Sequence, residues 1–200
     1  MIYCRECGKE LPDTAQFCSD CGAQQGDAKA WYRRGQKYYN GDGVPQDYDT
    51  ARQWYEKAAA QGNADAQYNL GSLYYNGDGV LQDYGVARQW YEKAAAQGHA
   101  DAQYSLGSLY YNGDGVPKDY QRARQWYEKA AEQGYAKAQN DLGFLYDNGK
   151  GVQRDYDMAR QWYEKAAAQG NSDAQYNLGV MFKQGRGMPY NYDTARQWYE

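Results

Sequence analysis

Four cysteines near the N-terminus carry the clearest chemistry in this sequence. They are Cys4, Cys7, Cys18 and Cys21, in a C-x2-C-x10-C-x2-C pattern, and the rest of the 200-residue chain contains none. A two-residue spacer lets both thiolates of a pair turn toward one metal ion, and two pairs supply a tetrahedral zinc site. Because four protein ligands close the coordination sphere, the sequence predicts one structural Zn2+ per chain and no catalytic metal.

Other interpretations of these motifs are weaker. Two disulfides would require an oxidising compartment, yet the start Met1-Ile2-Tyr3-Cys4 lacks the apolar run of a signal peptide. A redox C-x-x-C motif typically occurs singly, beside a βαβ pattern. The segment from Asn76 to Gly79 has Asn, Gly and Asp as a calcium loop does, but it lacks the EF-hand spacing and closing Glu, so a glycine-rich turn is favoured.

The N-terminal segment also resembles a known domain. From Tyr3 through Cys18 it is similar to the short zinc ribbons found at the N-termini of many bacterial proteins. The ten-residue spacer leaves room for a tight hairpin with Leu11 and Phe17 as its core, and so small a unit depends on its metal. We therefore expect a zinc ribbon over residues 1–26 and a second domain over residues 27–200.

The second domain is built from a 36-residue repeat. The period is clearest in five of the six tryptophans, which are Trp54, Trp90, Trp126, Trp162 and Trp198. Each copy has two halves with helical spacing of apolar residues; in the second copy these are Ala66, Leu70, Leu73 and Tyr74, then Ala87, Trp90, Tyr91, Ala94 and Ala95. We expect Asp83 to cap the second helix and Gly98 to end it in a left-handed conformation.

Aromatic residues must supply the core of these repeats. The chain has 24 Tyr and 6 Trp, and large rings bury enough area to compensate for a mean hydropathy of -1.09. The tryptophans are therefore predicted to be core, with Trp90 between neighbouring helices. Glu92 and Lys93 are predicted to form a hydrated outer face. His99 is the only histidine; it leaves little scope for His-based catalysis and is expected to be solvated in a turn.

The repeat motifs A-x-x-x-L-G-x-L-Y, N-G-x-G-V, D-Y-x-x-A, W-Y-x-K-A-A and Q-G resemble the Sel1-like repeat, a relative of the tetratricopeptide repeat. Close copies begin near Ala64, Ala100, Ala136 and Ser172. A degenerate copy starts at Ala28, with Arg34 and Lys37 in place of core leucines, and the last copy is truncated at Glu200. The resemblance implies an all-α fold, a right-handed α-solenoid of bacterial type, that binds proteins and has no catalytic residues.

One side of each first helix is predicted to bind a partner. In the second copy Tyr68 and Tyr75 lie opposite the core stripe, and by resemblance to the family this side lines a concave groove. The predicted binding residues are Tyr68, Tyr75, Tyr104, Tyr111, Phe144 and Tyr176. Tyrosine combines contact area with a polar tip, which suits a protein interface. The interpretation requires Tyr68, Tyr75, Tyr104 and Tyr111 to be partly exposed; in the alternative, these rings pack against adjacent helices.

These features favour a cytoplasmic scaffold that binds proteins or peptides and is not an enzyme. A hydrolase is one alternative, because some cysteine-rich Sel1-like proteins have been linked to β-lactam binding, but their cysteines lie within the repeats. Nucleic-acid binding by the ribbon is another, although Arg5 and Lys9 are outnumbered there by acidic residues and the net charge is -4. No stretch has the length and apolarity needed to span a membrane.

Overall fold

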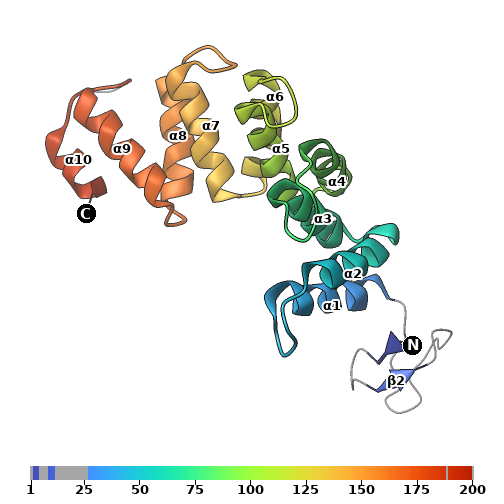
Figure 1. Cartoon of the computed structure of the whole chain (residues 1–200). Coiled ribbons are helices and arrows are strands. Elements are labelled where there is room, and N and C mark those ends of the chain that lie inside the picture. Colours follow the sequence, from blue (N-terminus) through green and yellow to red (C-terminus); the bar gives the residue numbers. More distant parts are fainter. Residues whose placement is uncertain (1, 5–8, 12–26, 188, 200) are drawn as a thin grey trace. The chain divides into compact units, whose positions relative to one another are not determined.

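The computed structural model describes residues 2–4, 9–11, 27–187 and 189–199 (Figure 1). Near the N-terminus β1 (Ile2–Tyr3) and β2 (Glu10–Leu11) pair antiparallel, with Ile2 opposite Leu11. The rest of the described chain is helices and turns. The helices are α1 (Ala28–Asn40), α2 (Tyr48–Ala60), α3 (Ala64–Asn76), α4 (Tyr84–Ala96), α5 (Ala100–Asn112), α6 (Tyr120–Glu132), α7 (Ala136–Asn148), α8 (Tyr156–Ala167), α9 (Ser172–Gln184) and α10 (Tyr192–Tyr199).

The chain divides into two compact units, Met1–Gln97 and Gly98–Glu200. The first contains α1 to α4 and the second α5 to α10. Within each unit every helix packs on the next one in sequence, so α1 and α2, α3 and α4, and the later pairs form helical hairpins (Figure 1). A hairpin of this size cannot bury both its faces alone, and stacking on the next hairpin extends the core.

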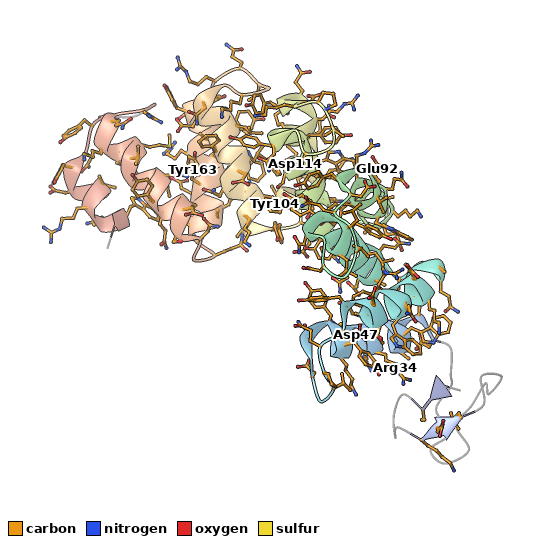
Figure 2. The ribbon with its side chains drawn as sticks, viewed as in Figure 1. Arg34, Asp47, Glu92, Tyr104, Asp114 and Tyr163 are labelled. Atoms are coloured by element: carbon orange, nitrogen blue, oxygen red, sulfur yellow. The ribbon has the colours of Figure 1, made fainter. Side chains whose placement is uncertain are left out.

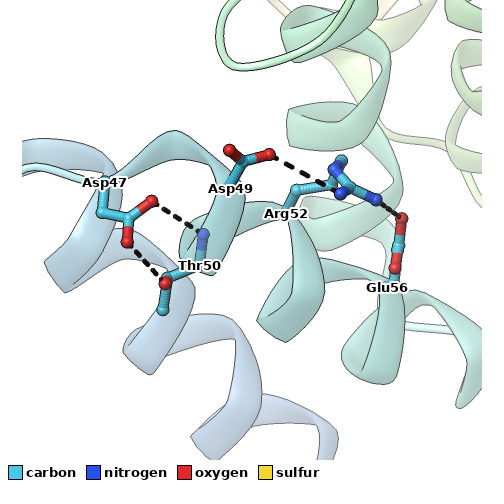
Figure 3. A network of polar contacts seen from close by, with 5 residues as sticks. All are labelled: Asp47, Asp49, Thr50, Arg52 and Glu56. Carbon is cyan, nitrogen blue, oxygen red and sulfur yellow. Dashed lines mark hydrogen bonds and ion pairs between the residues drawn. The ribbon is translucent and has the colours of Figure 1, made fainter.

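Each second helix begins with a side-chain cap, as predicted. Asp83 Oδ1 accepts a hydrogen bond from the N–H of Val86 at 3.0 Å. Figure 3 shows the same cap on α2, where Asp47 accepts from the N–H and the hydroxyl of Thr50 at 3.0 and 2.6 Å. These bonds satisfy helix donors that would otherwise lack a partner.

The same helix carries a surface ion pair. Arg52 of α2 pairs with Glu56 one turn later at 2.8 Å and with Asp49 at 3.6 Å (Figure 3). Pairs of this kind on a helix surface contribute only a few tenths of a kcal/mol, about 0.3–0.5 each. They therefore favour the helix without determining the fold.

Glycines make the turns between helices. Gly98 has φ +86°, which confirms the left-handed C-terminus predicted for α4. Gly77 and Gly79 have φ of +82° and +66° and form the turn after α3. A Cβ atom on Gly79 would lie 2.6 Å from the Cβ of Tyr48, so this turn rests directly on the preceding hairpin.

The deepest core contact joins a glycine of the first helix to a tyrosine of the second. Tyr91 is only 3% exposed, and a Cβ on Gly71 would come within 2.5 Å of its ring. The helical glycine therefore makes room for the ring. Equivalent pairs are Gly35 with Tyr55, Gly107 with Tyr127 and Gly143 with Tyr163.

The tryptophans, which were predicted to be core residues, lie half-buried at the edge of this core. Trp90 does pack between helices, against the buried residues of α2 and α3, but it is half-buried. The ammonium of Lys93, three residues later, covers its ring at 3.9 Å. Trp90 is thus enclosed by the core on one side and by a cation on the other.

The first hairpin departs from the others in α1, as the sequence indicates. Lys37 is exposed, and the guanidinium of Arg34 lies 4.5 Å from the ring of Trp54. The helix keeps contact with the core through aromatic residues, because Trp31 and Tyr38 both pack against it. The lost leucines are therefore replaced by rings.

A buried polar ladder also links the hairpins. Gln67 is 6% exposed; its Nε2 donates to the carbonyl of Ala59 at 3.3 Å, and its Oε1 accepts from Gln97 Nε2 at 2.8 Å. In the second unit Gln139 binds Ala131 and Gln169 in the same way, at 3.1 and 2.8 Å. The N–H groups of Gly62 and Gly134 also donate to the carbonyls of Ala59 and Ala131, so each glutamine adds a second hydrogen bond at the end of a helix.

Within the part of the chain that the structure describes, no helix has the length and apolar character needed to cross a bilayer. The cytoplasmic location stays a prediction.

Candidate functional site

The six aromatic residues predicted to bind a partner lie along the first helices of successive hairpins. We call them the aromatic row. In the first unit they are Tyr68 and Tyr75 of α3, and in the second Tyr104 and Tyr111 of α5, Phe144 of α7 and Tyr176 of α9. The first five are half-buried and Tyr176 is 61% exposed. Partial exposure of the four central tyrosines is thus confirmed, and their role in binding stays a prediction.

In the first unit the row packs sideways on the second helix of its own hairpin. The ring centroids of Tyr68 and Tyr91 are 5.7 Å apart, and those of Tyr75 and Tyr84 are 5.2 Å apart. The alternative interpretation, that these rings pack against neighbouring helices, therefore holds in part, although both rings stay partly exposed.

In the second unit polar side chains connect the row from helix to helix. The hydroxyl of Tyr104, labelled in Figure 2, donates to Asp141 Oδ2 at 3.0 Å. Asn140 Nδ2 donates to the other oxygen of Asp141 at 3.1 Å, and Asn177 Nδ2 donates to Asn140 Oδ1 at 3.0 Å. Burial raises the pKa of Asp141, and the hydrogen bonds from Tyr104 and Asn140 oppose that shift.

Charged side chains replace aromatic ones further along the second unit. Lys150 Nζ donates to the hydroxyl of Tyr111 at 3.0 Å. Asp147 stands at the row position one repeat after Tyr111, is 8% exposed, and pairs with Arg186 at 2.7 Å. At this one position the residue therefore changes from tyrosine in α5 to aspartate in α7, while Phe144 of α7 and Tyr176 of α9 remain aromatic.

The predicted outer face of the second helices is exposed and has partners within the chain. Glu92, labelled in Figure 2, pairs with Arg88 at 3.4 Å, and Lys93 covers Trp90. These charges support their own helix, which agrees with the prediction of a hydrated face.

His99 has a structural role that the sequence analysis missed. Its Nδ1 accepts from the N–H of Ala102 at 3.3 Å, and its side chain is only 14% exposed. The expectation of a solvated turn residue was wrong, because His99 is the N-cap of α5. The available signal was the asparagine at the same place in other copies, Asn63 and Asn171, which cap α3 and α9.

The described part of the ribbon fits a zinc knuckle. Cys4 follows β1 directly, its N–H donates to the carbonyl of Lys9 at 2.6 Å, and its side chain is 3% exposed. The two strands pair antiparallel with Ile2 opposite Leu11, and Leu11 is buried. The other predicted ligands, Cys7, Cys18 and Cys21, lie outside the described residues. Four thiolates are a donor set that zinc accepts readily.

No cluster of three or more His, Cys, Asp or Glu side chains suited to a metal occurs among the residues that the structure describes.

Two protein families match this chain. The family described as Sel1 repeat matches five consecutive segments, residues 28–63, 64–99, 100–135, 136–171 and 172–200. The family described as zinc-ribbon domain matches residues 3–25. No curated protein matches the chain.

Solved structures of Sel1 repeat proteins resemble it closely. A Sel1 repeat protein from Oxalobacter formigenes is 42% identical over 88% of this chain and 70% of its own, with a TM-score of 0.83. A protective antigen of uropathogenic Escherichia coli that displays an SLR fold is 44% identical over 86% of this chain, with a TM-score of 0.82, but the match spans only 37% of that protein. Cysteine rich protein B of Helicobacter pylori is 30% identical over 67% of this chain and 96% of its own, with a TM-score of 0.52. The predicted all-α solenoid class is confirmed.

Proposed function

Because the chain belongs to the Sel1 repeat family, we propose that it is an interaction scaffold whose aromatic row binds partner proteins or peptides. Scaffolding is the general role of Sel1 repeats. The finer claim is that this chain uses the row defined above as its contact surface. Tyr68, Tyr75, Tyr104, Tyr111, Phe144 and Tyr176 are the residues that we assign to it.

A single observation carries this assignment. The first helices turn one side to the core, where leucines such as Leu70 and Leu106 are fully buried, and present partly exposed rings on another side. Tyr176 is 61% exposed, more than any other member of the row. Exposed tyrosine at a regular position provides rigid contact area at low entropic cost, as in protein interfaces.

We also propose that residues 1–26 form a separate zinc ribbon and residues 27–200 the repeat domain. Cys4, Cys7, Cys18 and Cys21 would hold one zinc ion, which supplies folding energy and no catalysis. Elemental analysis of protein purified without chelator should give about one zinc per chain. Chelation should leave the helical circular dichroism almost unchanged, and a large loss of helix would contradict two independent domains.

We propose no reaction for this chain. Sel1 repeat proteins are in general non-catalytic scaffolds. The hydrolase alternative depends on cysteines within the repeats, and all four cysteines here precede residue 22. Nucleic-acid binding gains no support from a chain of net charge -4.

Cross-linking at one position tests the row directly. A benzophenone amino acid at position 176 should capture a defined protein from a lysate of the source organism, which mass spectrometry then identifies. The matched control is position 190, because Tyr190 is equally exposed at 64% but lies in the loop after α9.

Binding of the purified partner provides the second step. Tyr176→Ala should weaken it by about tenfold, the loss expected for an interface aromatic residue worth about 1.4 kcal/mol. Tyr190→Ala should leave it unchanged. Equal cross-linking at both positions, or equal affinity of both variants, would contradict the role of the row.

A further inference from the structure

Neighbouring hairpins meet through a pair of residues 39 positions apart. The first lies in the last turn of a first helix, and the second lies in the glycine turn one repeat later. In the second unit the pairs are Tyr111 with Lys150, joined at 3.0 Å, and Asp147 with Arg186, joined at 2.7 Å. In the first unit Asp78 follows Tyr39 by the same 39 positions.

The surroundings of these pairs are alike in the two units. Tyr39 stacks against Tyr48 with ring centroids 5.3 Å apart, and Tyr111 stacks against Tyr120, also at 5.3 Å. The glycine after each loop residue then presses on the second tyrosine: Gly79 rests on Tyr48, as Gly151 rests on Tyr120. Asp78 is therefore held beside its aromatic pair by the same backbone contact that holds Lys150 beside its own.

In the second unit a lysine ammonium lies beside the aromatic pair. The ammonium of Lys150 lies 5.1 Å from the ring of Tyr111, 5.3 Å from Tyr120 and 4.9 Å from Phe144. It also donates to the Tyr111 hydroxyl. Ring faces attract cations at such distances, so in this unit the chain provides its own cation.

The first unit has the aromatic pair without the internal cation. Asp78 is bonded locally, accepting from Asn76 Nδ2 at 3.1 Å. Among the residues that the structure describes, no lysine or arginine forms an ion pair with Asp78 or a cation–π contact with Tyr39 or Tyr48. Burial and the nearby charge of Asp78 both raise the pKa of Tyr39, which places the carboxylate near the packed rings of Tyr39 and Tyr48. A positive group would be favoured there.

We propose that Tyr39, Tyr48 and Asp78 bind a lysine or arginine side chain of the partner protein. This inference rests on the proposed scaffold function and adds a partner chemistry to it. Tyr39 occupies in the first repeat the position that Tyr75 and Tyr111 occupy in the aromatic row. A basic side chain of the partner would take the place that Lys150 takes in the second unit.

A charge swap in the full-length protein tests the proposal, with fluorescein-labelled hexalysine as the probe. Asp78→Lys should fill the site from within, as Lys150 does, and weaken hexalysine binding by a factor of about ten. The reciprocal Lys150→Asp should create a second site and strengthen binding by a similar factor. Fluorescence anisotropy at about 0.15 M salt, where long-range attraction is screened, measures both.

Asp42→Lys is the matched control. Asp42 stands in the equivalent turn of the first repeat and accepts from Asn40 at 3.1 Å, as Asp78 does from Asn76. Asp42→Lys changes the net charge by the same amount as Asp78→Lys does. Asp42 has no tyrosine pair beside it from a preceding repeat, because it lies in the first repeat. Hexalysine affinity should fall by at most about twofold in this variant, since only screened surface charge changes.

Three results would overturn the proposal. They are equal losses in Asp78→Lys and Asp42→Lys, no measurable hexalysine binding by the parent, and no gain from Lys150→Asp. Lysine already occupies this turn position in the second unit, so the swap should fold, and an unchanged helical melting curve checks this. Cross-linking at position 176 does not depend on Asp78, so failure of the charge swap is distinguishable from failure of the scaffold function.

Discussion

The core side and the row side of the first helices differ in how much their residues vary from repeat to repeat. On the core side the same residue recurs at full burial, as in Leu70, Leu106, Leu142 and Leu178. On the row side the corresponding register reads Tyr75, Tyr111, Asp147 and Lys183, and these range from buried to exposed. At these positions the second to fifth repeats keep one residue on the core side, whereas the row side changes in both size and charge.

The two sides therefore differ in how strongly a substitution affects stability. A core position is fixed by packing on both neighbours, so each change there costs free energy of unfolding. A half-exposed position tolerates substitution at a small cost. The repeats can therefore present different chemistry on the row side while most of their core residues stay the same, which is what the proposed scaffold function requires.

The largest effect should follow from filling the space between Gly107 and Tyr127. A Cβ at position 107 would meet the Tyr127 ring well inside van der Waals contact. Tyr127 is 2% exposed, so its ring is enclosed by neighbouring atoms. Gly107→Ala should therefore lower the free energy of unfolding by about 3 kcal/mol, even though alanine favours a helix. Urea denaturation followed by circular dichroism measures the change.

Gly85→Ala is the control for this variant. Gly85 lies in the first turn of α4, where the equivalent residues of other repeats are Asp49, Gln121 and Asp157, so a side chain fits there. This substitution should leave the stability unchanged or raise it by up to about 1 kcal/mol. Equal losses in both variants would mean that the close contact with Tyr127 is not what matters at position 107.

Sequence reasoning recovers the repeat, its helices and their caps, because these depend on local periodicity and on the preferences of Asp and Gly. It fails where a contact joins separate helices. Tyr91 and Trp90 both lie on the apolar stripe, and only the position of Gly71 on the facing helix decides which ring is buried. The recurrent helical glycine was the available signal.

The polar contacts between hairpins were hidden for a related reason. Tyr111 and Lys150 are 39 positions apart, and so are Asp147 and Arg186. Their meeting depends on how one hairpin stacks on the next, which no single helix pattern contains. The aromatic row itself was predictable, because the side opposite a known core stripe follows from helix geometry alone.

An intermediate effect is expected at the edge of the core. Trp90 is half-buried, with Lys93 over its outer side. Since a fully buried tryptophan costs 3–5 kcal/mol on truncation, Trp90→Ala should lower the free energy of unfolding by about 2 kcal/mol. Urea denaturation again provides the measurement. Trp90→Phe keeps a ring in the same place and should lose less stability. If Trp90→Ala lost more stability than Gly107→Ala, Trp90 would belong to the centre of the core.

The smallest effect is expected at Asp141, beside the aromatic row, and it should be recognisable by its dependence on pH. The pKa of Asp141 is raised above 3.8, first because of burial, so the folded state holds this proton more tightly than the unfolded state does. The sign follows from linkage: as the pH rises from about 4 toward 7 the folded protein must carry a buried charge, and this group's contribution to stability falls.

Asp141→Asn removes that titration but also one of the two acceptors for Tyr104 and Asn140, so its stability at a single pH is not diagnostic. The informative quantity is the difference in melting temperature between variant and parent as a function of pH. That difference should move in favour of Asp141→Asn as the pH rises, by an amount that corresponds to less than about 1 kcal/mol. A difference that is constant with pH, or that moves the other way, would show that burial does not raise the pKa of Asp141. The charged form of Asp141 would then not lower the free energy of unfolding.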